Sequence, residues 1–133
     1  MATLRRSPIL VETTILVDYL RGANAAADYL DAARADADLV CSLVTAAELI
    51  VGAQSRAELR AIDKLLARFQ EALIDRHDSV RALKWLKKYY YSHATGFHDC
   101  LLAAAALRLH APIVTLNEKH FRVLPGVQVI RPY

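Results

Sequence analysis

The chain alternates short apolar runs with longer stretches in which apolar residues recur every three or four positions. Short runs bounded by polar residues are typical of buried strands, whereas the longer periodic stretches predict helices. We expect strands at residues 7–12, 39–42, 72–74, 112–115 and 127–130. We expect helices at residues 13–21, 24–35, 45–53, 78–91 and 98–109, and a further one after Ser55. Strands and helices therefore alternate along the chain.

This alternation predicts an α/β fold around a central parallel sheet. Strands that are apolar throughout need cover on both faces, which helices provide when they connect parallel strands by right-handed crossovers. No linker-like or low-complexity segment interrupts the pattern, so we expect one domain over residues 1–133. In such sheets ligands bind beyond the carboxyl ends of the strands.

Composition narrows the class of protein only slightly. Hydrophobic residues make up 55% of the chain and charged residues 23%, which fits a compact globular protein and argues against extensive disorder. The formal net charge of +3 favours anionic partners such as nucleic acid only modestly. The apolar run in the opening "MATLRRSPILVE" is too short for a signal peptide, and no stretch reaches about 18 apolar residues, so we expect a cytoplasmic protein without a membrane segment.

The cysteines and histidines do not indicate zinc or a disulfide. Cys41 and Cys100 both lie in apolar surroundings without paired spacing, as buried free thiols do in a reducing compartment. His93 and His98 lack the close, repeated ligand spacing of a structural zinc site. We expect His98 to border the functional site without binding a metal.

Three acids fall at the ends of predicted elements. Glu12 ends the first strand, Glu48 lies in the first turn of the helix after the second strand, and Asp99 opens the helix before the fourth strand. All three can face one edge of a parallel sheet. Gathered carboxylates repel one another unless a cation lies between them, and Mg²⁺ or Mn²⁺ suits an all-oxygen site.

Each acid also has an ordinary structural explanation. Thr45 and Glu48 have the spacing of a capping box, and Asp99 can oppose the positive end of its helix. Glu12 can be a loop carboxylate beside two threonines that cap a helix. A receiver-like phosphotransfer domain is a rival class, but it requires a phosphoacceptor Asp ending a central strand. Spacing alone leaves these explanations open.

Longer motifs resemble a known family. The segments "ILVETTILVDYLRG", "SLVTAAELIVGA", "GFHDCLLAAAALRLHAPIVTLNEKHF" and "LPGVQVIRPY" resemble PIN-domain ribonucleases, and specifically VapC-type toxins of bacterial toxin-antitoxin modules. The resemblance spans nearly the whole chain, and residues 98–121 are its most specific part. It implies a PIN-like three-layer α/β/α sandwich and Mg²⁺- or Mn²⁺-dependent cleavage of RNA such as tRNA. It also implies a homodimer and a VapB-like antitoxin partner.

The resemblance also assigns residues to the site. It places the metal-binding catalytic acids on Glu12, Glu48 and Asp99, with Thr13 or Thr14 and Asn117 as polar neighbours. We do not expect Asp18, on the following helix, to turn inward.

Two positions depart from the family's usual pattern. Glu12 stands where the family usually has Asp, and a carboxylate displaced by about 1 Å can weaken metal-assisted catalysis. A catalytically impaired PIN-like protein that binds RNA and antitoxin is therefore an alternative. His120 stands where many members have a fourth acid; it is either a contact to an RNA phosphate or a polar residue at a helix start.

Residues 81–91 combine basic and aromatic side chains. Lys87 and Lys88 are candidate contacts to RNA phosphates, as is Lys119 further along the chain. The neighbouring tyrosines fit better as core or dimer-interface residues, because Leu83, Leu86 and Tyr90 form an apolar helical face.

Overall fold

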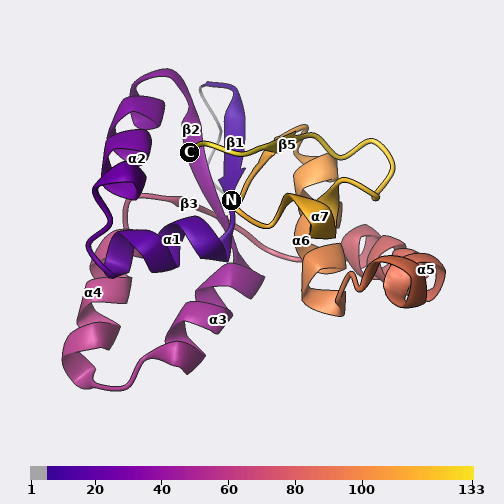
Figure 1. Cartoon of the computed structure of the whole chain (residues 1–133), viewed down its shortest axis with the longest axis horizontal. Coiled ribbons are helices and arrows are strands. Elements are labelled where there is room, and N and C mark those ends of the chain that lie inside the picture. The colour runs from indigo at the N-terminus through magenta and orange to yellow at the C-terminus, as the bar shows by residue number, and fades with distance from the viewer. Residues whose placement is uncertain (1–5) are drawn as a thin grey trace.

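The computed structural model describes residues 6–133; residues 1–5, which belong to the opening segment considered for a signal peptide, lie outside the described part. Five strands and seven helices are formed there (Figure 1). The strands are β1 (Pro8–Val11), β2 (Asp38–Ser42), β3 (Gln70–Ala72), β4 (Ile113–Val114) and β5 (Val129–Ile130). The helices are α1 (Thr13–Leu20), α2 (Asn24–Asp36), α3 (Leu43–Gly52), α4 (Arg56–Leu66), α5 (Arg76–His93), α6 (Phe97–Arg108) and α7 (Glu118–Phe121).

The strands form one parallel sheet in the order β3-β2-β1-β4-β5. The central strand β1 pairs with β2 on one side, Ile9 opposite Leu39, and with β4 on the other, Leu10 opposite Ile113. Because β1 comes first in the chain and its two neighbours come second and fourth, the chain changes direction across the sheet at β1. The carboxyl end of β1 is therefore the place where an open α/β sheet offers a ligand crevice.

Hydrophobic residues cover both faces of the sheet. On one face, Val11 and Val114 pack with buried residues of α1, α2, α3 and α4; on the other, Leu10 and Ile113 pack with α5, α6 and α7. Figure 1 shows α1, α2 and α4 to one side of the sheet and α5, α6 and α7 to the other. Successive residues of a strand point to opposite faces, which is why adjacent residues belong to different clusters. The predicted three-layer α/β/α sandwich with a parallel sheet is confirmed.

Several predicted boundaries are wrong. The helix predicted at residues 78–91 spans Arg76–His93, and the strand predicted at residues 127–130 is limited to Val129–Ile130. The third strand is at Gln70–Ala72, not residues 72–74, and pairs Ser42 with Ala72. Leu73 lies beyond the strand and is 57% exposed. The helix predicted from residue 45 begins at Leu43, because the Ser42 hydroxyl caps it by accepting the Val44 N–H at 3.1 Å.

One helix, α7, was not predicted as a separate element. It is a single turn, held in place by Phe121, which is 1% exposed. None of the described helices is both long and apolar enough to span a bilayer.

Candidate active site

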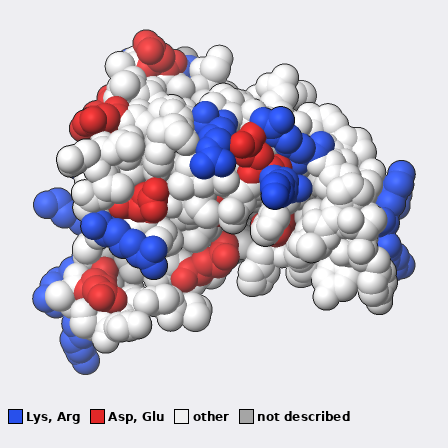
Figure 2. Space-filling view, viewed as in Figure 1, with Lys and Arg blue, Asp and Glu red and all other residues white. Residues whose placement is uncertain are grey.

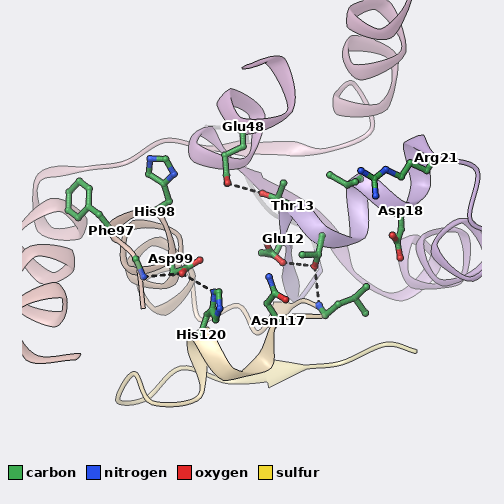
Figure 3. Close-up of a pocket in the computed structure, with 14 residues that line it drawn as sticks. Glu12, Thr13, Asp18, Arg21, Glu48, Phe97, His98, Asp99, Asn117 and His120 are labelled. Carbon is green, nitrogen blue, oxygen red and sulfur yellow. Dashed lines mark hydrogen bonds and ion pairs between the residues drawn. The ribbon is translucent and has the colours of Figure 1, made fainter. Parts of the chain in front are cut away.

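All three predicted acids line one cavity of about 730 Å³ at the carboxyl end of β1. Glu12 directly follows β1, Glu48 lies on α3 and Asp99 near the start of α6. Figure 3 shows the three carboxylates around the same hollow, each carried by a different element. Glu48 lies 36 positions after Glu12 in sequence (48 − 12), and Asp99 lies a further 51 positions on (99 − 48). The fold brings all three to one edge of the sheet.

Glu12 is held tightly by two threonine hydroxyls. It is 7% exposed, and its Oε1 accepts hydrogen bonds from Thr14 Oγ1 at 2.6 Å and from Thr115 Oγ1 at 2.5 Å. Each hydroxyl also accepts a backbone N–H, that of Leu116 for Thr14 and that of Asn117 for Thr115. A carboxylate can only accept, so both hydroxyls donate their protons to Glu12, while one lone pair of each accepts a backbone N–H. Glu12 connects β1 to α1 and is buried, and its side chain does not cap α1.

Glu48 does not form the capping box that the sequence suggested. It is the sixth residue of α3, and Ser42 caps that helix. Its Oε1 accepts a hydrogen bond from Thr13 Oγ1 at 2.9 Å, which ties α3 to the start of α1. Glu48 is exposed, and the hydrogen bond that its side chain makes is to α1 and not within its own helix.

Asp99 combines a structural task with its place in the cavity. Its Oδ2 accepts the Gly96 N–H at 3.1 Å, as expected for an acid at the positive end of a helix. The same oxygen lies 3.2 Å from His120 Nδ1 on α7. His120 is thus placed beside the acid that the family resemblance assigned to the metal.

The three acids share one pattern of hydrogen bonding. In each, one carboxylate oxygen is fixed by protein donors, while the second has no partner among the interactions of residues 6–133. In this part of the chain no buried side-chain oxygen or nitrogen lacks a hydrogen bond, so the free oxygens of Glu12 and Asp99 are open to solvent. The cavity therefore presents a set of oriented oxygen donors.

This donor set fits a hard divalent ion. Within residues 6–133 no three His, Cys, Asp or Glu side chains are gathered closely enough to enclose an ion by themselves. Mg²⁺ does not require such a cage, because it keeps several waters and is usually held by one or two carboxylates together with substrate phosphates. Glu12, Glu48 and Asp99 would hold it with their free oxygens.

Cys100 follows Asp99 but does not add a ligand. Burial and the negative charge of Asp99 raise the pKa of its thiol to about 11. Thiols bind metals and attack substrates as thiolates, so Cys100 stays protonated and inert.

The other candidate residues differ in their placement. Thr13, Asn117 and His120 all line the cavity, and so does His98, which fits its expected place at the border. Lys87, Lys88 and Lys119 are exposed but lie outside the cavity lining.

The aromatic residues of α5 divide between the core and the surface. Trp85 is buried and Tyr89 packs against the core, whereas Tyr90 is 49% and Tyr91 95% exposed. Of the three tyrosines that were expected in the core or at a dimer interface, only Tyr89 is covered by residues of this chain.

The expectation for Asp18 is wrong, and some lining residues were not anticipated. Asp18 lines the cavity, and its Oδ2 accepts a hydrogen bond from the Tyr133 hydroxyl at 2.9 Å. Arg21, which was left without a role, and Phe97, which was not considered, also line it. The sequence did contain a signal for Asp18 and Arg21, because helical periodicity places both on the same face as Thr14.

Comparison with known proteins assigns a family. The sequence pattern of the PIN domain matches residues 9–126. Over 121 residues the chain is 32% identical to ribonuclease VapC19 of Mycobacterium tuberculosis, covering 90% of this chain and 96% of that protein. The chain therefore belongs to the PIN domain family, in which it is a VapC-type member.

Solved structures agree on the fold. A toxin-antitoxin complex from Klebsiella pneumoniae has a chain with a TM-score of 0.78 at 26% identity, covering 94% of this chain and 98% of that one. VapBC-1 of nontypeable Haemophilus influenzae gives a TM-score of 0.76 at 25% identity, with 92% and 96% covered. VapBC2 of Rickettsia felis, bound to a DNA fragment from its promoter, gives 0.79 at 19% identity, with 92% and 97% covered, and shows the fold alone.

Proposed function

We propose that the protein is a metal-dependent endoribonuclease, the toxin of a type II toxin-antitoxin module, which hydrolyses phosphodiester bonds of RNA. The observation that carries this proposal is the set of three carboxylates, each with one fixed and one free oxygen, in a single cavity at the switch in strand order. The name of the VapC19 relative as a ribonuclease supports the same activity.

The roles of the acids follow from their contacts. Glu12, Glu48 and Asp99 would hold Mg²⁺ or Mn²⁺, and the ion would act as a Lewis acid that lowers the pKa of a bound water and stabilises negative charge on the phosphate. Thr14 and Thr115 fix Glu12 before substrate arrives, and Thr13 does the same for Glu48, so little reorganisation is needed. Asn117 and His120 lie at the same cavity and offer hydrogen bonds to the phosphate.

The biological setting is proposed from the relatives. The Klebsiella and Haemophilus structures are toxin-antitoxin complexes, so we propose a VapB-like antitoxin as partner, acting in the cytoplasm on a homodimeric toxin. A basic side chain of the antitoxin would neutralise the acidic cavity. RNA, including tRNA, is the substrate class.

The deciding experiment is cleavage of a labelled panel of tRNAs and single-stranded RNAs by purified, antitoxin-free protein. We expect discrete products with Mn²⁺ or Mg²⁺ and none in EDTA. Asp99→Asn and Glu48→Gln should abolish cleavage and keep the fold, because both substitutions keep the shape of the side chain. Asp31→Asn, which changes an exposed acid on α2 outside the cavity, serves as the matched control.

Two results would reject this assignment. Full metal-dependent activity in Asp99→Asn would show that this acid is not needed for cleavage and would contradict the three-carboxylate site. RNA or antitoxin binding without cleavage by the wild type would favour the impaired, binding-only alternative.

A further inference from the structure

The acidic cavity contains one strongly basic side chain. Besides the three acids, Asp18 also lines it, and Arg21 is the only Lys or Arg among the lining residues of the described chain. RNA carries a negative charge on every phosphate, so a strand that enters this cavity meets carboxylate repulsion except where cations offset it. Arg21 is the protein's own cation at that place.

Arg21 is positioned by helix α1. The lining residues Thr14, Val17, Asp18 and Arg21 recur at helical spacing, so the face that begins beside Glu12 ends at Arg21. Gly22 follows with φ of +87° and ends the helix there. Figure 3 shows the Arg21 side chain extending from the end of α1 toward the cavity.

No residue in the described chain uses the Arg21 guanidinium. Its side chain makes no hydrogen bond or ion pair within residues 6–133, and its neighbour Asp18 instead accepts a hydrogen bond from Tyr133. Arg21 is also exposed. Its five N–H donors are thus available to a ligand, and phosphate is a ligand that they bind in a bidentate manner.

The other end of the cavity carries an aromatic ring. Phe97 is the first residue of α6, two residues before Asp99, and is 42% exposed although it is a large apolar side chain. Figure 3 shows Phe97 and Arg21 at opposite ends, with the three carboxylates between them. An exposed ring beside a nuclease site offers a surface for an unpaired base.

We propose that Arg21 and Phe97 hold the RNA on opposite sides of the bond to be cut. The Arg21 guanidinium binds a backbone phosphate, and the Phe97 ring stacks on a base. In a duplex the bases stack on one another, so Phe97 favours an unpaired strand or loop. The proposal rests on the proposed function and adds the contacts that place the substrate.

Charge on the surface supports discrete phosphate contacts. On the face seen in Figure 2, Lys and Arg side chains lie in separate groups beside acidic ones and not in one continuous basic surface. A protein that binds RNA with few phosphate contacts depends strongly on each, and the number of contacts sets the slope of affinity against salt.

The test is RNA binding by Asp99→Asn protein, which does not cut. Affinity for a labelled single-stranded oligonucleotide, and for the same strand in a duplex, is measured by fluorescence anisotropy over a range of salt. Arg21→Gln should reduce the slope of log K against log salt by about 0.7, the loss of one phosphate contact on a single strand. Phe97→Ala should weaken single-strand binding by about fivefold or more without changing the slope. Phe97→Trp should restore it.

Matched controls separate these contacts from general effects. Arg60→Gln removes an exposed charge from α4, and Tyr91→Ala removes an aromatic ring that is 95% exposed on α5, both outside the cavity. Neither should change binding as the test variants do. Thermal unfolding confirms that all variants are folded.

The outcomes distinguish this proposal from the proposed function. If the wild type cuts RNA but Arg21→Gln and Phe97→Ala bind like the parent, the contacts are wrong and the nuclease assignment stands. If Phe97→Ala changes only the oligomeric state in size-exclusion chromatography, the ring belongs to a protein interface and the proposal is overturned. If the wild type neither binds nor cuts RNA, both proposals fail.

Discussion

Glu12 and Thr115 lie 103 residues apart in sequence, yet their side chains share a hydrogen bond of 2.5 Å. Thr115 donates its hydroxyl proton to Glu12, and the same hydroxyl oxygen accepts the Asn117 N–H at 2.9 Å. Thr14 repeats the arrangement with the Leu116 N–H. Two hydroxyls, each also bound by a backbone N–H, thus hold one carboxylate oxygen of Glu12 at its present side-chain length.

We predict that Glu12→Asp lowers the rate of RNA cleavage. Shortening the side chain by one methylene withdraws the carboxylate by about 1 Å from the two hydroxyls, and a displacement of that size can cost about a hundredfold in rate. Single-turnover cleavage in Mn²⁺ measures the effect. Glu71→Asp, the same change at an exposed position on β3, should leave the rate unchanged.

A faster Glu12→Asp enzyme at equal stability would mean the opposite. The natural Glu would then impair the site, and the binding-only alternative would gain support.

We predict that Thr115→Val destabilises the protein and slows cleavage. Valine has nearly the same shape but removes a donor to the buried Glu12 and an acceptor for the Asn117 N–H, at a cost of about 1–3 kcal/mol in unfolding free energy. Urea unfolding measures it. Thr115→Ser keeps the hydroxyl and should recover most of the loss. Equal destabilisation by both substitutions would show that packing, and not the hydroxyl, is responsible.

We predict that Mn²⁺ stabilises the wild type against unfolding. An ion that binds only the folded state at a concentration about one hundred times its Kd adds about 2.7 kcal/mol. Asp99→Asn and Glu48→Gln should lose most of this gain, whereas Asp31→Asn should keep it. A Mn²⁺-dependent shift of the melting temperature that persists in Asp99→Asn would place the ion elsewhere.

We predict that Arg108→Met destabilises the fold by about 3 kcal/mol. Arg108 Nη2 lies 2.9 Å from the carboxylate of Asp78, which is 2% exposed, so its removal leaves a buried charge without its partner. The value is at the low end for breaking a buried pair because the Arg108 side chain is 32% exposed. Arg122→Met, which breaks an exposed pair with Glu118 within one helical turn, should cost less than about 0.5 kcal/mol. Similar losses of unfolding free energy in Arg108→Met and Arg122→Met would show that burial of Asp78 does not make its ion pair more important.

We predict that acid weakens the wild type more than Asp75→Asn. The hydrogen bond from the Asp78 N–H, and then the charge of Arg108, lower the pKa of Asp75 below its ordinary 3.8. A carboxylate whose pKa is lower when folded stabilises the protein above the unfolded value and loses this effect as pH falls through the folded value. Asn still caps α5, so urea unfolding of both proteins from neutral pH downward isolates the charge. If the free energy of unfolding depends on pH in the same way in both proteins, the Asp75 charge does not contribute to stability.

Much of the fold follows from local patterning, and the misplaced strand shows where patterning fails. β1 and β2 lie inside the sheet and each contains three consecutive apolar residues, Ile9–Val11 and Leu39–Cys41, so they were located nearly to the residue. In β3 only Ala72 is buried, and the apolar Leu73 that suggested a later strand is exposed. An edge strand is defined by its pairing partner, which no local pattern contains.

The functional site, too, could be predicted from the sequence only in part. The sequence placed Glu12 and Asp99 correctly at the ends of elements, whereas Glu48, predicted in the first turn of its helix, lies in the second turn of α3. The partners that orient these acids were not visible in the sequence, because Thr115 reaches Glu12 only through the pairing of β1 with β4. Asp18 was misjudged although helical spacing from Thr14 was sufficient to place it.

The separation of Glu12 from Thr115 also bears on how a cell makes such a protein. Synthesis proceeds from the N-terminus, so Glu12 leaves the ribosome long before Asp99 and Thr115 do. Until β4 has emerged and paired with β1, the cavity does not exist. An unfinished chain that ends before β4 therefore carries Glu12 without its Thr115 partner and without the assembled acidic cavity.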